Sequence, residues 1–305
     1  MKVFISTSQF ASENSEPLQL LKSRGIEPEL NPYRRKLSED EIIELLKQIK
    51  CEGLIAGLEP LTKRVFQEAK ELKVISRLGV GLENVDIGAA NHFGIKVFNT
   101  PGLLTDAVAE LTLALILNCL RHISFLDRNL RKGIWEKGMG SLLKGKCVGI
   151  VGFGHIGQRV AELVTAFDAK VIYFDIEPRT TSSFNAVTLD VLLKQADIIS
   201  MHASGSRQIL GKSELALLKK GAVIINTARA AVIDEQGLID QLSTGRIAGA
   251  GIDVFSEEPY SGELLNLKNV VLTPHIGSYA IETRAAMEAM AVNNLIQGFK
   301  ELQLI

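Results

Sequence analysis

The fold of this chain is decided by residues 146–158, which read Lys146-Cys-Val-Gly-Ile-Val-Gly-Phe-Gly-His-Ile-Gly-Gln158. An apolar, β-branched run leads into three glycines with the spacing G-x-G-x-x-G, and a helical pattern follows at once. Gly152 permits a tight turn from strand to helix, Gly154 lets a pyrophosphate approach the backbone, and Gly157 lets the helix pack close to the strand. The stretch therefore predicts a strand–turn–helix unit that binds a dinucleotide.

The next residues supply the context that a lone glycine turn lacks. Residues 170–175 (Lys170-Val-Ile-Tyr-Phe-Asp175) are typical of a second buried strand and end in an acid, 18 residues after Gly157. A carboxylate at this place binds the ribose hydroxyls of adenosine. The alternatives are a purely structural glycine turn and a loop cap at Asp175. Because strand, turn, helix, strand and acid occur in order, dinucleotide binding is the favoured interpretation.

The composition excludes several classes of partner. The 305 residues suggest about two domains. Lys plus Arg is 34 and Asp plus Glu is 35, so no net field favours nucleic acid or a membrane surface. Cys51, Cys119 and Cys147 lie in apolar runs and indicate buried thiols, not a disulfide framework or a metal site. We find neither a signal peptide nor an apolar run of about 18 residues, and we expect a cytoplasmic protein.

Strands that alternate with helices predict parallel sheets. The expected strands are 3–6, 53–56, 74–77, 96–99, 148–151, 170–175, 197–201, 222–226, 247–254 and 270–273. The expected helices are 16–23, 39–49, 61–72, 85–91, 106–124, 188–195, 212–219, 235–243 and 282–300. Ser38 and Glu41 have the spacing of a capping box, and Thr100-Pro-Gly102 is the predicted hinge.

The predicted fold is α/β, with two doubly wound parallel-sheet domains and a cleft between them. A flavodoxin-like substrate-binding domain comprises residues 1–98 plus 283–305, and a Rossmann NAD-binding domain comprises residues 99–282. Helix 106–124 is apolar around most of its girth, so we expect it to pack between domains or against a second subunit. This pattern predicts a homodimer. Residues 128–142 are expected to form a polar connector that contains the single tryptophan, Trp135.

Residues at the carboxyl ends of the predicted strands form the candidate site, since ligands bind there in open parallel sheets. The segments are 79–81, 227–229, 253–258 and 274–277, and they include Arg229 and His275. An arginine can hold a carboxylate with two N–H bonds, and a histidinium can protonate an oxygen that gains charge as hydride arrives. Alone, His275 would be a core or surface histidine and Arg229 a helix-terminal charge or salt-bridge partner. Together they predict reduction of a carbonyl by hydride transfer.

The motifs together resemble those of the D-isomer-specific 2-hydroxyacid dehydrogenases. The resemblance covers nearly the whole chain, in the order of the family, and is greatest to the D-3-phosphoglycerate dehydrogenase branch. The motifs are Arg77-Leu-Gly-Val-Gly-Leu-Glu-Asn-Val-Asp86, Asn99-Thr-Pro-Gly102, Val108-Ala-Glu110, the glycine turn, Asn226-Thr-Ala-Arg229, Asp253-Val-Phe-Ser-Glu-Glu-Pro259 and Thr273-Pro-His-Ile-Gly277.

The resemblance implies a role for each matching residue. Arg229 would anchor the substrate carboxylate, His275 would give the proton to the carbonyl, and Glu258, which directly precedes Pro259, would be its partner. Asp175 would select NAD over NADP, and Asp253 would bind the nicotinamide amide. The implied substrate-binding residues are Gly79, Val80, Gly81, Arg229 and His275. The implied cofactor-binding residues are Gly152, Gly154, His155, Ile156, Gly157, Asp175, Thr227, Ala228, Asp253, Ser278 and Val80.

The reaction implied first is the NAD-dependent interconversion of D-3-phosphoglycerate and phosphohydroxypyruvate, a step of serine biosynthesis. A hydroxypyruvate or glyoxylate reductase is the enzymatic alternative, and an NAD(H)-sensing protein similar to corepressors is the alternative of another class. Phosphoglycerate enzymes carry an arginine after the strand 53–56, where this chain has Gly57-Leu-Glu-Pro60. Arg34 or Arg35 is a hypothetical substitute, and a solvated basic loop is the competing interpretation.

Overall fold

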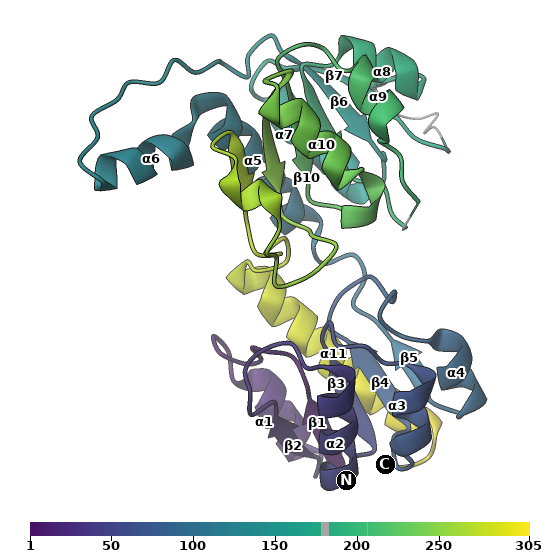
Figure 1. Cartoon of the computed structure of the whole chain (residues 1–305). Coiled ribbons are helices and arrows are strands. Elements are labelled where there is room, and N and C mark those ends of the chain that lie inside the picture. Colours follow the sequence, from purple (N-terminus) through teal and green to yellow (C-terminus); the bar gives the residue numbers. More distant parts are fainter. Residues whose placement is uncertain (178–182, 206) are drawn as a thin grey trace. The chain divides into compact units, whose positions relative to one another are not determined.

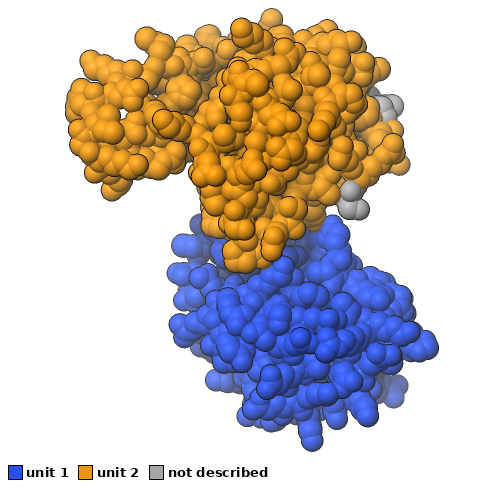
Figure 2. Space-filling model, in the orientation of Figure 1, with its two compact units in different colours: residues 1–103, 279–305 blue, residues 104–278 orange. Residues whose placement is uncertain are grey.

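The computed structural model describes residues 1–177, 183–205 and 207–305 (Figure 1). The chain divides into two compact units (Figure 2). Unit 1 comprises Met1–Leu103 and Tyr279–Ile305, and unit 2 comprises Leu104–Ser278. The boundaries expected at residues 98 and 283 lie a few residues from these.

Unit 1 is built on a parallel sheet with the strand order β2-β1-β3-β4-β5. The strands are β1 (Lys2–Ile5), β2 (Glu27–Leu30), β3 (Gly53–Ala56), β4 (Val74–Arg77) and β5 (Lys96–Phe98). The helices are α1 (Glu16–Ser23), α2 (Glu39–Ile49), α3 (Lys63–Glu68), α4 (Ile87–His92) and α11 (Ile281–Glu301). All four residues of β3 are buried, as expected for a central strand covered on both faces.

The C-terminal helix α11 belongs to unit 1, although most of the chain lies between it and the other elements of that unit. It packs on β3, β4 and β5. A Cβ at Gly53 would lie 2.6 Å from the ring of Phe299, and one at Gly298 would lie 2.6 Å from Val74. Two glycines therefore let the helix and the sheet approach closely.

Two elements of unit 1 differ from the prediction. Strand β2 was not expected because its sequence, Glu27-Pro-Glu-Leu30, is polar; it lies at the sheet edge, where proline is tolerated. Helix α3 is shorter than the expected 61–72. Leu61 instead forms a parallel bridge with Val85. That pairing ties two loops together and delays the start of the helix.

Unit 2 contains a parallel sheet with the order β12-β11-β10-β9-β6-β7-β8. The strands are β6 (Cys147–Val151), β7 (Lys170–Phe174), β8 (Asn185–Ala186), β9 (Ile198–Met201), β10 (Ala222–Asn226), β11 (Ile247–Ile252) and β12 (Val270–Leu272). The helices are α5 (Thr105–Arg121), α6 (Ile123–Arg131), α7 (His155–Thr165), α8 (Leu189–Gln195), α9 (Lys212–Leu217) and α10 (Glu235–Ser243), with the short 3-10 turns η1 (Ala230–Val232) and η2 (Glu263–Asn266).

The strand order of unit 2 reverses at β6. From β6 the chain adds β7 and β8 on one side and β9 to β12 on the other. A dinucleotide binds at such a switch point, at the carboxyl end of the strand. The two parallel α/β units confirm the predicted fold class. The exposed two-residue strand β8 was not predicted, because two residues carry no periodic pattern.

The expected helix 106–124 is two helices. His122 has a left-handed backbone (φ 56°), which ends α5, and α6 then occupies part of the predicted connector 128–142. Helix α5 buries Val108, Leu115 and Ile116 and packs on β10, β11 and α7 of its own unit. In the described part of the chain no single helix could cross a membrane; α5 and α6 reach the needed length and apolarity only as a pair bent by 64°.

The predicted capping box is confirmed at the start of α2. The hydroxyl of Ser38 accepts a hydrogen bond from the Glu41 amide (3.2 Å), and the Glu41 carboxylate accepts one from the Ser38 amide (2.9 Å). Each bond satisfies a donor that a helix N-terminus leaves unpaired.

We expect Ser38→Ala to lower the free energy of unfolding by about 1 kcal/mol, because it removes the cap of α2. Urea denaturation measures the change. Ser15→Ala is the matched control, since Ser15 precedes α1 without a side-chain bond to its backbone. Equal losses in both variants would contradict a specific role for the box.

Candidate active site

The glycine turn lies at the switch point of unit 2 and has the geometry of a phosphate site. Gly152 has φ 92°, and a Cβ there would lie 2.4 Å from the Ala203 nitrogen. At Gly157 a Cβ would lie 2.2 Å from the Gly152 oxygen. At Gly154, the N-cap of α7, a Cβ would meet nothing within 4 Å. Space is therefore open beside Gly154, where the amides of the first turn of α7, including His155 and Ile156, lack partners within the helix. These residues fit the pyrophosphate of NAD.

Asp175 ties the end of β7 to the glycine turn. Its carboxylate accepts hydrogen bonds from the Phe153 amide (2.5 Å) and the Glu177 amide (3.0 Å). The structure thus displays the loop-capping role directly. Each carboxylate oxygen has a further lone pair, so the same group can also accept from a ribose hydroxyl.

His275 and Glu258 form a hydrogen-bonded pair. Nδ1 of His275 lies 2.9 and 3.0 Å from the two carboxylate oxygens of Glu258. The side chains are 36% and 23% exposed, so a ligand can reach them. Because Nδ1 faces the carboxylate, Nε2 is the ring atom left to exchange a proton with a substrate. Glu257 is exposed beside this pair, in agreement with the choice of Glu258.

Asp253 braces the loop that carries His275. It is 1% exposed and accepts hydrogen bonds from the Thr273 hydroxyl (2.6 Å), the Ile276 amide (2.9 Å) and the Gly277 amide (2.9 Å). Burial raises the pKa of the Asp253 carboxyl, and the hydrogen bonds counteract it. This bracing role was not predicted, because the sequence does not reveal which donors surround the carboxylate. Ser278 follows the braced loop at the last position of unit 2.

Arg229 is held by the loop after β10. The Asn226 side chain accepts from the Ala228 amide (3.1 Å) and donates to the Arg229 carbonyl (2.9 Å). Thr227 is buried and its hydroxyl lies 2.9 Å from that of Thr112 on α5. Asn226 and Thr112 thus support the site, and neither was predicted as a site residue. Asn226 does belong to one of the motifs quoted above, whereas Thr112 does not. Arg229, Glu258 and His275 follow β10, β11 and β12, which are neighbours in the sheet.

The other substrate-binding candidates lie in unit 1, in the loop after β4. The Gly79 amide donates to the Thr100 hydroxyl (2.9 Å), and the Val80 carbonyl accepts from the Asn99 side chain (2.8 Å). Val80 is exposed and Gly81 is partly exposed. The structure therefore presents this loop at the carboxyl edge of the unit 1 sheet.

His202 is a supporting residue of unit 2. Its Nε2 lies 2.7 Å from the Ser200 hydroxyl, and burial lowers the pKa of His202 to about 3. The loop that follows includes Ser206, which lies outside the described residues.

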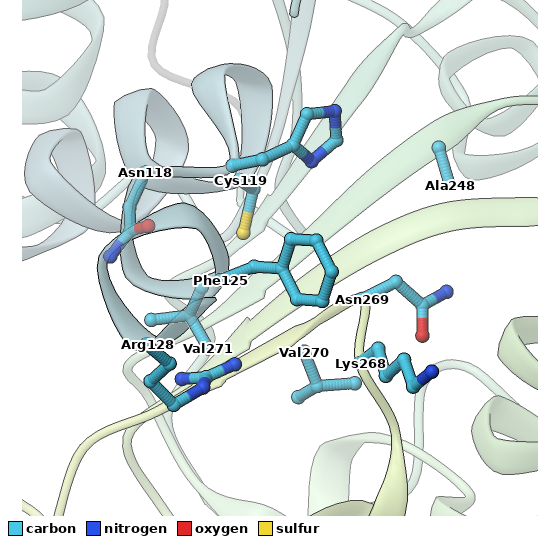
Figure 3. A pocket seen from close by; sticks show the side chains of 10 residues that line it. Asn118, Cys119, Phe125, Arg128, Ala248, Lys268, Asn269, Val270 and Val271 are labelled. Carbon is cyan, nitrogen blue, oxygen red and sulfur yellow. The ribbon is translucent and has the colours of Figure 1, made fainter. Parts of the chain in front are cut away.

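A small pocket at the junction of α5 and α6 is no substrate site. Its volume is about 20 Å³, enough for a single water molecule (Figure 3). Its lining includes Cys119, Phe125, Arg128, Lys268 and Asn269, and none of the predicted site residues.

Comparisons with known proteins agree with this geometry. Residues 113–277, more than half of the chain, match the family described as D-isomer specific 2-hydroxyacid dehydrogenase, NAD binding domain. The chain is 38% identical to a hydroxypyruvate reductase of Thermotoga maritima, covering 95% of both chains, and 44% identical to a glyoxylate reductase of Thermococcus litoralis, covering 78% of this chain and 77% of the relative. The crystal structure of the TT0316 protein from Thermus thermophilus superposes with a TM-score of 0.90, at 36% identity over 99% of this chain and 97% of that one. This protein therefore belongs to the D-isomer-specific 2-hydroxyacid dehydrogenase family and is an NAD-dependent dehydrogenase of that family.

Proposed function

We propose that this dehydrogenase reduces a short, unphosphorylated 2-oxo acid, hydroxypyruvate or glyoxylate, to the D-2-hydroxy acid. The observation that carries the reaction is the His275–Glu258 pair, which lies on the same sheet edge as Arg229. The two relatives named above are a hydroxypyruvate reductase and a glyoxylate reductase. They support the alternative substrates, and neither is named for phosphoglycerate or for serine biosynthesis.

Each residue has one proposed task. Arg229 binds the substrate carboxylate. The backbone of residues 79–81 remains a proposed substrate contact. His275 delivers a proton from Nε2 to the carbonyl oxygen, while Glu258 holds Nδ1 and so fixes the ring. The bound cofactor supplies the hydride. In the oxidative direction His275 accepts the proton instead. Thr227, Ala228, Asp253 and Ser278 remain proposed cofactor contacts.

The absence of a cation after β3 favours an uncharged distal group on the substrate. The turn is Gly57-Leu-Glu-Pro60, and its acid, Glu59, is buried. Arg35, one of the two hypothetical substitutes, forms two hydrogen bonds with Glu41 (2.6 and 2.9 Å) and lies over the ring of Tyr33. Its guanidinium is therefore already engaged within its own loop, which argues against a phosphate clamp formed by Arg35.

A substrate panel tests the proposal. With NADH, we expect hydroxypyruvate or glyoxylate to exceed phosphohydroxypyruvate at least about tenfold in kcat/KM, a difference of about 1.4 kcal/mol. NADPH should serve poorly, because the Asp175 carboxylate repels a 2′-phosphate. A higher kcat/KM for phosphohydroxypyruvate than for the other two substrates would favour the phosphoglycerate reaction instead. Tight NADH binding without turnover of any oxo acid would favour the NAD(H)-sensing alternative.

We expect His275→Gln to lower kcat/KM for the oxo acid by about 10² to 10⁴, the usual contribution of general acid catalysis. Glu258→Gln should cause a smaller loss, since the ring stays in place but loses its charged partner. The dissociation constant of NADH, measured by fluorescence, should not change. Glu257→Gln is the matched control and should retain full activity; a comparable loss there would contradict the assignment of Glu258.

We also propose a homodimer formed through α6 and the coil that follows it, which stand away from the sheet of unit 2 in Figure 1. This arm exposes Trp135 (81%) and Met139 (94%), together with Ile123, Leu130, Ile134 and Leu142. So many large apolar side chains on one arm are typical of a protein interface. A second copy is the occupant that we propose, since symmetric pairs are the most common assemblies of soluble chains.

Light scattering should give about twice the chain mass of 33.3 kDa. Replacing Trp135 and Met139 with serine should shift the protein toward monomer, because buried aromatic side chains dominate interface energies. Leu265→Ser, an exposed leucine outside the arm, is the control. A monomeric wild type would refute the dimer. The cytoplasmic location remains a prediction.

A further inference from the structure

Glu59 is a buried carboxyl group that the proposed reaction does not use. It follows β3 in unit 1 and is 1% exposed. Its carboxylate accepts from the Gly57 amide (3.1 and 3.2 Å) and is hydrogen-bonded to the hydroxyl of Ser6. Removing a carboxyl group from water costs free energy, and hydrogen bonds from neighbouring groups must offset that cost. The partners of Glu59 therefore indicate which segments it holds in place.

One set of partners joins the turn after β3 to the loop after β4. The Asn84 side chain donates to the Glu59 carbonyl (2.7 Å) and to the Gly57 carbonyl (3.3 Å). The Leu61 amide donates to the Asn84 carbonyl (2.8 Å), and the Asp86 amide donates to the Leu61 carbonyl (2.9 Å). Glu59 therefore sits within the turn to which residues 84–86 are fastened.

The guanidinium of Arg77, the last residue of β4, packs on the start of the same loop. Its Nη1 donates to the Leu78 carbonyl (2.8 Å), and a Cβ on Gly79 (φ 151°) would lie 1.0 Å from that nitrogen. Arg77 thus packs directly against the backbone of residues 78–79, and the φ of Gly79 is one that residues with a Cβ rarely adopt. Burial raises the pKa of the Glu59 carboxyl above its usual value, although its hydrogen bonds and the positive charge of Arg77 oppose the shift.

We propose that Glu59 is a positioning residue for the oxo acid, because its carboxylate fixes the turn of residues 57–59. Asn84, in the loop that continues from residues 78–81, is fastened to the carbonyls of that turn. This inference rests on the proposed function of that loop in binding the substrate. Glu59 does not touch the substrate. It determines how well Val80 and Gly81 are held in the binding conformation before the substrate arrives.

The test uses the full-length protein and three variants. Glu59→Gln keeps the shape and removes the charge, and Asn84→Ala cuts the link between the two loops. Glu288→Gln is the matched control, since Glu288 is the other buried carboxylate of unit 1, pairs with Arg284 (3.2 Å) and accepts from the Ala11 amide (3.0 Å). We measure KM and kcat for hydroxypyruvate or glyoxylate, NADH binding, and amide hydrogen exchange of peptides spanning residues 78–86.

We expect Glu59→Gln and Asn84→Ala to raise KM about tenfold with kcat and NADH binding nearly unchanged, and to speed exchange in residues 78–86. Glu288→Gln should change neither KM nor that exchange. Unchanged KM and exchange in Glu59→Gln, or equal effects in the control, would overturn the inference. If Glu59→Gln does not fold, Asn84→Ala decides by the same criteria. If the wild type reduces no oxo acid, the proposed function fails and the exchange data alone decide the role of Glu59.

Discussion

The close approach of α7 to β6 is the constraint on which the rest of unit 2 depends. The backbone of Gly157 lies so near the Gly152 carbonyl that no side chain fits between them. This contact turns the first turn of α7 toward the carboxyl end of β6, the strand at which the sheet order reverses. Because later strands add outward from β6, the segments after β10, β11 and β12 follow along the same edge. Arg229, Glu258 and His275 occupy those segments.

In both units, polar side chains from neighbouring segments hold the loops that carry the candidate site residues. Asp253 accepts from two amides and a hydroxyl of the loop around His275, and Asn226 brackets the loop before Arg229. In unit 1, the Asn84 side chain joins the loop after β4 to the turn after β3, and the Glu59 carboxylate accepts from the Gly57 amide of that turn. A hydrogen bond to a charged group contributes about 1.5–3 kcal/mol, so several such bonds can keep an irregular loop in one conformation. Catalysis that depends on orientation needs this rigidity.

The positions of charged side chains bear on whether the substrate is a phosphorylated or an unphosphorylated 2-oxo acid. The proposed reaction assigns the carboxylate anchor and the proton donor of a 2-oxo acid reductase to Arg229 and His275. A phosphorylated substrate needs a further cation, and the turn after β3 carries a buried acid. The guanidinium of Arg35 is already paired with Glu41. Membership of the family establishes the dehydrogenase reaction, and the proposal of a small, unphosphorylated substrate rests in part on this turn.

The sequence by itself determined the features that depend on local pattern. The glycine spacing, the alternation of strands and helices, the capping box at Ser38 and the order of the motifs predicted the α/β fold and selected Glu258 and His275, which the structure brings within hydrogen-bond distance. Tertiary structure decided what depends on distant partners. The polar strand β2 forms because β1 offers an edge, and α5 ends at His122 because the backbone there is left-handed. Likewise the donors around Asp253 and Glu59 come from segments that only folding brings together, since burial and hydrogen-bond geometry are properties of the packed chain.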